Sequence, residues 1–465
     1  MAPAPSKPAA KRLYDVAILG PDVGGAATAA LCARRGLRTL LAPMGPVSAS
    51  RESEGWLLPS AACVLPPLRQ LSGAVGVLDE LGVGTDLHRQ GAGTGSFQIL
   101  SDKLRLSLPT EAHRRKAELR RELSEAGASE AEAALESLEA LGRTWDAFLM
   151  EPPPWPARGF FEKRRVQKLL PKPPQLPDGL VGECLQALAP FASSLPADFA
   201  PESAAREAAA LLRMPLRIFG GAAHLADLLR QKCEGAGGDV IADPAADLRE
   251  EKKGFVFQLD GSEVRAACVV LACSSDRIGA LVQGGGRTER KVSDEAALPV
   301  ERKVALAHFV VRPEGLPQAL DDVALLLGNR MGPLVITTLP ARKLRGETSG
   351  ERLLTVARIA DAGFSDEVSL VSSSRAALEN VLPFFERHVV HQAGDPNPAQ
   401  PHLILRAPEN AEAVGLRPVS EASERLLFAS GATYPGFGIE GQLLAARAAS
   451  AQALALTGRK TVSAT

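Results

Sequence analysis

The feature that most constrains the fold is a strand, a glycine turn, a helix and a second strand near the N-terminus. The apolar run LYDVAILG (13–20) is typical of a buried parallel strand, and GGAATAALCARRG (24–36) is rich in small helix formers. LRTLLAP (37–43) is the next strand. Such a unit begins a Rossmann-type fold, so the chain is predicted to be an α/β protein.

The turn GPDVGG (20–25) departs at one position from the G-x-G-x-x-G sequence of dinucleotide-binding sites. Gly20 and Gly25 hold the first and third glycine places, and Gly24 precedes the third. Asp22 replaces the middle glycine, which normally lets the backbone approach a pyrophosphate. A carboxylate about 4 Å from a phosphate is repelled by on the order of 4 kcal/mol at an effective dielectric constant of about 20.

A second departure lies at the end of the second strand, where such sites place an acidic residue for the ribose hydroxyls. That position is Ala42, followed by Pro43, and neither side chain accepts a hydrogen bond. Two interpretations of Asp22 stay open. Its carboxylate caps the helix N-terminus in place of a phosphate, or a nucleotide still binds with shifted phosphates.

Composition restricts the remaining classes of protein. The net charge of −1 gives no reason to expect nucleic acid as a partner, and no run of about 18 apolar residues suggests a membrane span. The N-terminal MAPAPSKPAAKR lacks the apolar stretch of a signal peptide. The cysteines lack C-x-x-C spacing, which predicts reduced, buried thiols in a cytoplasmic protein. They are Cys32, Cys63, Cys184, Cys233, Cys268 and Cys273.

Two later segments carry a family resemblance. Residues 215–273 contain a Gly-Gly turn, a helix and strands, with a hairpin about Asp260-Gly261, and residues 424–454 contain a strand, a Gly/Pro-rich turn and a small-residue helix. With the N-terminal unit and EGWLLPSAACVLPPL (54–68), they resemble the phytoene desaturase and carotenoid isomerase branch of the flavin amine oxidase superfamily. The matching positions are Gly220, Gly221, Leu225, Gly238, Val240, Gly431, Ala432, Pro435, Gly436 and Gly438.

The resemblance implies that the chain binds FAD. It places the backbone of Val240 beside the adenine, and in MGPVSASRES (44–53), where the family has a Gly-Gly-Arg-like phosphate clasp, only Arg51 could serve. The candidate flavin contacts are Gly431, Ala432, Gly438 and Ile439. The alternative is that these C-terminal glycines only join the last strand to the last helix. No catalytic residue is assigned, because the flavin carries this chemistry.

The predicted architecture is a Rossmann-type FAD-binding domain built from three segments, with an α+β substrate domain inserted in two pieces. The nucleotide-binding segments are 13–100, 216–290 and 416–457; the insertions are 101–215, which is helical, and 291–415, which forms a sheet; the tails are 1–12 and 458–465. Apolar spacing predicts a helix over 131–150, and apolar runs predict strands over 303–311 and 351–360.

A further helix is predicted around residues 377–391, with His388 and His391 one turn apart. Since no third ligand is in view, these histidines are interpreted as helix-surface residues and no metal site is predicted.

The segment PPPWPARGFFEKRRVQKLLPKPP (152–174) sets Trp155, Phe160 and Phe161 beside several Lys and Arg residues. Aromatic and basic side chains together suit the boundary of an anionic bilayer, which would place the protein at the inner face of the membrane. A packed lid with a solvated basic face is the alternative.

Two functions follow from these observations. The first is an FAD-dependent oxidoreductase, desaturase-like or isomerase-like, that acts on an apolar polyene-like or lipophilic substrate. The second is a non-catalytic scaffold that has lost FAD binding and binds a lipid or protein partner. Asp22, Ala42 and the missing phosphate clasp favour the scaffold, and the C-terminal turn favours the enzyme. An NAD dehydrogenase ranks third, because it needs the same altered motif.

Overall fold

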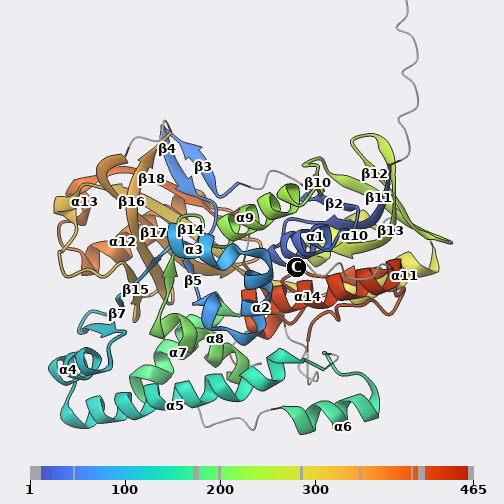
Figure 1. The fold of residues 1–465 in the computed structure, drawn as a ribbon. Helices are drawn as coiled ribbons and strands as arrows, with labels where there is room; N and C mark the ends of the chain where they lie inside the picture. The colour runs from blue at the N-terminus through green and yellow to red at the C-terminus, as the bar shows by residue number, and fades with distance from the viewer. Residues whose placement is uncertain are drawn as a thin grey trace, which may run out of the picture.

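The computed structural model describes most of the chain, and it gives a mixed α/β fold (Figure 1). The described residues are 12–44, 48–153, 155–170, 177–196, 201–282, 286–344, 348–398, 402–406 and 414–458. Apart from Arg12 and Gly458, the two predicted tails lie outside the described residues. So do Pro154 and residues 171–174 of the predicted membrane segment.

The first sheet confirms the Rossmann-type prediction, because it draws strands from three separated parts of the chain. Its order is β10-β2-β1-β13-β12-β11, with β20 beside the end of β13. The parallel strands are β1 (Arg12–Leu19), β2 (Thr39–Ala42), β10 (Asp239–Val240), β13 (Ser262–Leu271) and β20 (Leu426–Phe428). Two antiparallel strands, β11 (Ala245–Glu251) and β12 (Gly254–Leu259), extend it, and the predicted hairpin at Asp260-Gly261 is confirmed.

Helices cover both faces of this sheet, which explains why its central strands β1, β2 and β13 are rich in buried apolar residues. Ile18 of β1 packs with α1 (Val23–Arg34), α9 (Gly221–Gly235) and α14 (Gly438–Thr457). Leu19, the next residue, belongs to the core on the opposite face, with α10 (Ser275–Leu281) and α11 (Arg287–Ala296). Side chains of successive strand residues alternate between faces, so each core receives every second residue.

The second sheet forms the substrate-domain side of the molecule. Its order is β18-β14-β17-β16-β15-β7-β8, with β19, β3 and β4 attached. Its strands are β3 (Ser50–Ser53), β4 (Trp56–Pro59), β7 (Ser96–Leu100), β8 (Arg105–Pro109), β14 (Val300–Val311), β15 (Val323–Leu326), β16 (Leu334–Lys343), β17 (Thr348–Asp361), β18 (Val389–Asp395) and β19 (Leu403–Leu405). The strands predicted at 303–311 and 351–360 are confirmed as parts of β14 and β17. Segment 13–100 therefore contributes strands to both sheets.

The remaining elements are mostly helices. The helical insertion holds α4 (Ala112–Glu122), α5 (Glu125–Met150), α6 (Gly159–Leu169), α7 (Gly179–Ala192) and α8 (Pro201–Arg213). Elsewhere lie α2 (Ser72–Leu81), α3 (Val83–Gln90), α12 (Glu367–Val381), α13 (Phe385–His388) and a small sheet of β5 (Val64–Leu65), β9 (Leu216–Arg217) and β6 (Ala92–Gly93). The helix predicted at 131–150 is confirmed within α5, where Leu135, Leu138, Trp145 and Phe148 are buried.

The helix predicted around 377–391 is wrong in its second half. α12 ends at Val381, and after α13 the chain enters β18 at Val389. Pro383 explains the break, because proline lacks an N–H and disfavours helical backbone at the residue before it. His391 lies in β18 with its ring near Ser53 and Glu54, so it shares no helix face with His388. Among the described residues no cluster suits a metal ion.

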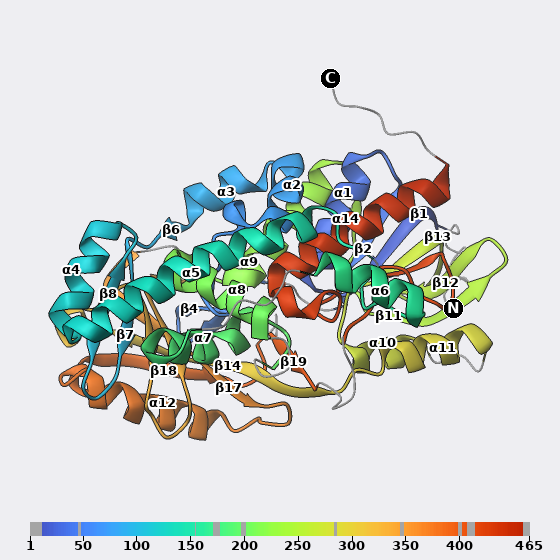
Figure 2. The ribbon, with the colours of Figure 1, turned by 90° about the horizontal axis from the view of Figure 1, so that it is seen from below.

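One continuous apolar core joins the two sheets through the helical insertion. It contains Val16 and Ile18 of the first sheet, Leu306 of the second, and residues of α5, α7 and α8. Figure 2 shows α5 and α7 running past the second sheet, with α14 on the side of the first sheet. All six cysteines are buried and unbridged, as predicted. No helix in the described part of the chain is both long and apolar enough to cross a membrane.

The close packing of the first turn makes a stability prediction. Gly20 has φ +134°, and a Cβ there would lie 2.0 Å from the carbonyl oxygen of Ala272. Gly36 also has a positive φ, +81°, but a Cβ there would meet nothing within 4 Å. We expect Gly20→Ala to lower the free energy of unfolding by about 3 kcal/mol or more, and Gly36→Ala by only about 1 kcal/mol. Urea denaturation of both variants measures the difference, and equal losses would contradict this packing.

Candidate functional site

The predicted dinucleotide turn keeps the geometry of its first and third glycines. The Gly20 N–H donates to the carbonyl oxygen of Ala42 at 2.9 Å, which ties the turn to the end of β2. A Cβ at Gly25 would lie 2.4 Å from the Cβ of Ala272, so this glycine lets α1 approach β13. These two positions therefore serve strand–helix packing, which is their usual role in such a fold.

Asp22 does not cap the helix that follows it, so the predicted self-cap is wrong. It occupies the position before α1, but its side chain makes no capping hydrogen bond. Instead its Oδ2 accepts a hydrogen bond from the backbone N–H of Gly431 at 3.0 Å. Gln442 of α14 caps one N–H group in the first turn of α1: its Oε1 accepts a hydrogen bond from the Gly24 N–H at 3.1 Å. The carboxylate thus joins the N-terminal glycine turn to the C-terminal one.

Burial governs the ionisation of Asp22. Removal of its carboxyl from water raises its pKa to about 6, although the hydrogen bond from Gly431 and the charge of Arg277 both act to lower it. A carboxyl group with this pKa is mostly ionised at pH 7. The glycine turn, where the motif resemblance implies a pyrophosphate, therefore already holds a negative charge and its hydrogen-bond donor.

The other residues considered for the adenosine part of FAD do not all lie together. Ala42 is fully buried, with 0% exposure, and leaves no room for a longer acidic side chain. Val240 is half-buried on β10, which pairs with β2. Arg51 lies in β3 of the other sheet, where its guanidinium donates to the carbonyl oxygen of Gly394 at 2.7 Å and pairs with Asp395 at 3.5 Å. The structure does not bring Arg51 to the glycine turn.

The C-terminal turn, 431–438, is covered by the end of α7. A Cβ at Gly438, which has φ +49°, would lie 2.0 Å from the carbonyl oxygen of Ala192. The Ser194 N–H donates to the carbonyl oxygen of Pro435 at 2.8 Å. Ala432 is buried and Ile439 is half-buried against the core. Three of the candidate flavin contacts, Ala432, Gly438 and Ile439, are therefore packed against other parts of the protein.

Beneath this turn lies a buried ionic cluster that the sequence did not reveal. Arg206 of α8 is 3% exposed, and it pairs with Glu207 at 2.6 Å and with Glu440, both 0% exposed. Its other amino group pairs with Asp146 of α5 at 3.1 Å. Glu440, in the first turn of α14, also accepts from the Gly73 N–H at 2.7 Å. The cluster fastens α8, α14, α5 and α2 together around the C-terminal turn.

The surroundings of Glu207 favour its protonated form. Burial and the neighbouring charge of Glu440 raise its pKa well above the usual value, and the attraction of Arg206 does not offset them. Its Oε2 has no hydrogen-bond partner among the described residues. Arg206 therefore faces three carboxyl groups, of Asp146, Glu207 and Glu440, with a single positive charge.

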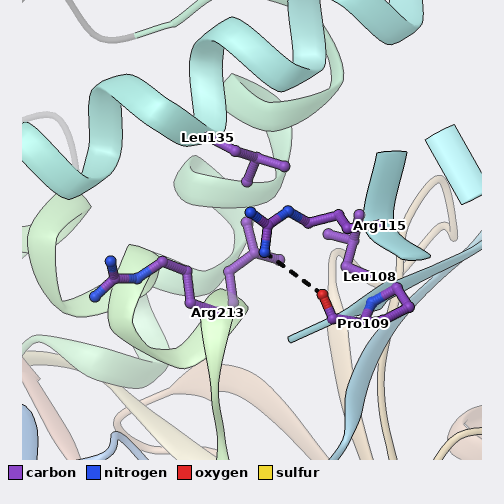
Figure 3. Close-up of a pocket in the computed structure, with 6 residues that line it drawn as sticks. Leu108, Pro109, Arg115, Leu135 and Arg213 are labelled. Carbon is purple, nitrogen blue, oxygen red and sulfur yellow. Dashed lines mark hydrogen bonds between the residues drawn. The ribbon is translucent and has the colours of Figure 1, made fainter. Parts of the chain in front are cut away.

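Two hollows in the described part of the chain lie away from these turns. The first, shown in Figure 3, has an empty volume of about 270 Å³, part of which is open to solvent. It is lined by Leu108, Pro109, Arg115, Leu135, Leu212 and Arg213. The second pocket has an empty volume of about 200 Å³, also partly open to solvent. Neither Asp22 nor Gly431 lines either pocket.

These observations test whether the residues fit the FAD that the resemblance implies. The Gly24 and Gly431 N–H groups already have protein acceptors, and one of these is a carboxylate. The Gly438 backbone lies against Ala192. In this arrangement the described residues do not fit FAD.

Comparisons with known proteins show the fold. No protein-family model matches the chain, and no curated protein does. An oxidoreductase from Methanosarcina mazei is 12% identical, with a TM-score of 0.61 over 93% of this chain and 99% of that one. A double mutant of putrescine oxidase is 15% identical, with a TM-score of 0.59 over 97% and 100%. The PF1083 protein from Pyrococcus furiosus is 14% identical, with a TM-score of 0.58 over 94% and 97%.

At these identities the likeness shows the fold, and nothing beyond it. The chain has the fold of Rossmann-type FAD-binding oxidoreductases that carry a substrate domain.

The buried cluster predicts an unusual pH dependence of stability. Above about pH 4.5 the unfolded chain has released the Glu207 proton, whereas the folded protein keeps it because the folded pKa is raised. The folded state then binds more protons, so its stability is greatest below this pH and falls by up to about 1.4 kcal/mol per pH unit as pH rises toward the folded pKa. Glu207→Gln should remove this loss.

Urea denaturation between pH 4.5 and 8 measures the effect. The matched control is Glu424→Gln, at an exposed position, which should keep the wild-type slope. A slope that Glu207→Gln leaves unchanged would show that Glu207 is ionised in the folded protein.

Proposed function

We propose that this chain is a non-catalytic scaffold with a flavoprotein fold, in which the protein's own side chains close the cofactor groove. The observation that carries the proposal is the hydrogen bond from the Gly431 N–H to Asp22 Oδ2 at 3.0 Å. It joins the two turns between which a dinucleotide would lie, and it puts a carboxylate in the position of a phosphate. The scaffold would bind a lipid or protein partner through its outer surface.

The closure does not depend on one bond alone. FAD would have to displace Asp22 from Gly431 and Gln442 from Gly24, and it would have to separate the C-terminal turn from Ala192. Each displaced donor or acceptor needs a new partner, because an unpaired buried polar group costs about 1–3 kcal/mol. A phosphate beside Asp22 adds repulsion between like charges. These costs all oppose binding of the same ligand.

A second candidate is an FAD-dependent oxidoreductase of the desaturase or isomerase type, acting on an apolar polyene-like substrate. The Gly/Pro-rich turn that leads into α14 and the fold shared with oxidoreductases favour it. In this case Asp22 would leave Gly431, and FAD would lie along Gly20, Gly24 and Gly25, with Val240 at the adenine. When bound there, FAD would supply the redox chemistry of the reaction.

Thermal melts with and without FAD distinguish the two candidates. We expect FAD to leave the melting temperature of the wild-type protein unchanged. Asp22→Gly removes the carboxylate, frees the Gly431 N–H and restores the usual middle glycine, so FAD should raise its melting temperature by a few degrees. A ligand at 100 times its Kd stabilises a protein by about 2.7 kcal/mol, which such a melt detects.

Asp22→Asn is the matched control, because the amide oxygen can still accept from Gly431 while the charge is gone. Its melt should respond to FAD less than that of Asp22→Gly. A wild-type response to FAD as large as that of Asp22→Gly would contradict the scaffold and support the oxidoreductase.

A further inference from the structure

The outer face of α6 is built from two adjacent columns of exposed side chains. Residues four apart lie above one another on a helix, so Phe160, Arg164 and Lys168 form one column and Phe161, Arg165 and Leu169 form the next. Phe160 is 71% exposed, Phe161 85% and Leu169 51%, and the three basic residues are also exposed. We call these six residues the α6 face.

The opposite side of α6 is fixed to the body of the protein. Val166 is buried, and Glu162 pairs with Arg417 and accepts a hydrogen bond from the Arg158 N–H at 2.9 Å. Arg158 in turn pairs with Glu421. Glu162 and Val166 are themselves four residues apart, so they define the inner side of the helix. The orientation that exposes the two phenylalanines is therefore specified by contacts on the inner side.

Trp155 does not belong to this face, although its place in the sequence suggested that it would. Its side chain is half-buried and packs against the main core, with its ring 6.2 Å from that of Phe148. Replacing it would disturb the core and not the outer surface. The aromatic part of the α6 face is Phe160 and Phe161, whose rings lie 5.6 Å apart.

The chemistry of the α6 face suits one kind of partner. Its charged members are all positive, and no ion pair within the described part of the chain engages Arg164, Arg165 or Lys168. A helix that combines exposed aromatic rings with Lys and Arg can insert the rings at a lipid headgroup boundary while its cations meet anionic headgroups. A nucleic acid would be met by the cations alone, which leaves the two exposed rings and Leu169 unexplained.

We propose that the α6 face docks the protein on the surface of an anionic lipid bilayer. Figure 1 shows α6 at the lower edge of the molecule, beyond α14 and α11, where a flat surface can reach it. The inference deepens the proposed function, because it names the partner of the scaffold. It does not need the groove to be closed, since the α6 face includes none of the residues around the two glycine turns.

Co-sedimentation with vesicles tests the proposal. The vesicles are phosphatidylcholine with about 30% phosphatidylserine, compared with phosphatidylcholine alone, at low and at physiological salt. We expect the full-length protein to sediment with the anionic vesicles and to be released as salt rises. Phe160→Ser with Phe161→Ser, and separately Arg164→Gln, Arg165→Gln and Lys168→Gln together, should each weaken binding by at least about tenfold.

Control variants remove exposed apolar or basic side chains elsewhere on the surface. Val368→Ser with Phe384→Ser removes two other exposed apolar side chains, which are 78% and 63% exposed. Arg114→Gln with Arg120→Gln removes exposed charges of α4. Both controls should bind like the wild type. Equal loss in a control, equal binding to uncharged vesicles, or no binding at low salt would overturn the proposal.

Thermal melts of the same variants with and without FAD distinguish a failure of lipid binding from a failure of the scaffold proposal. Variants of the α6 face should show the wild-type response to FAD, and Asp22→Gly should bind vesicles like the wild type. Lipid binding can therefore fail while the groove proves closed, and FAD can bind while the lipid contact holds.

Discussion

The contact on which this structure depends is the hydrogen bond between Asp22 and the Gly431 N–H. It joins residues 409 apart in the chain and draws the first and last segments of the Rossmann-type domain together. In a dinucleotide-binding protein the ligand's phosphates satisfy donors of this kind. Here a carboxylate supplies the negative charge from within the chain, at the cost of burying a group whose pKa is raised to about 6.

The rest of the groove is consistent with that replacement. The Gly24 N–H donates a hydrogen bond to Gln442. The Gly438 backbone lies against the end of α7, and Arg206 pairs with Glu440 beneath the same turn. Glycines that let a backbone approach a cofactor can equally let two protein segments approach one another. The structure therefore keeps the glycines of the fold and uses them for packing. The glycine turns therefore have a packing role in a chain that lacks the acidic residue and the arginine that would contact FAD.

Much of the fold could be predicted from the sequence, because its elements carry local signals. The unit from β1 to β2, the Asp260-Gly261 hairpin and the apolar stripe of α5 follow from periodicity and turn residues. The helix predicted around 377–391 extends too far, because Pro383 interrupts the helical backbone after α12. The partner of Asp22 and the Arg206 cluster could not be predicted, since they join residues hundreds of positions apart. The orientation of Trp155 is of the same kind, because it depends on the packing of α5.

The packing of Asp22, Gln442 and Ala192 around the two glycine turns leaves no place for FAD in the folded protein. The visible absorption spectrum of the purified protein, taken after incubation with excess FAD and gel filtration, tests this claim. We predict that the protein peak emerges without the absorption of bound flavin. A flavin band that stays with the protein through the column would contradict the claim and would show that Asp22 and Gly431 separate to admit the cofactor.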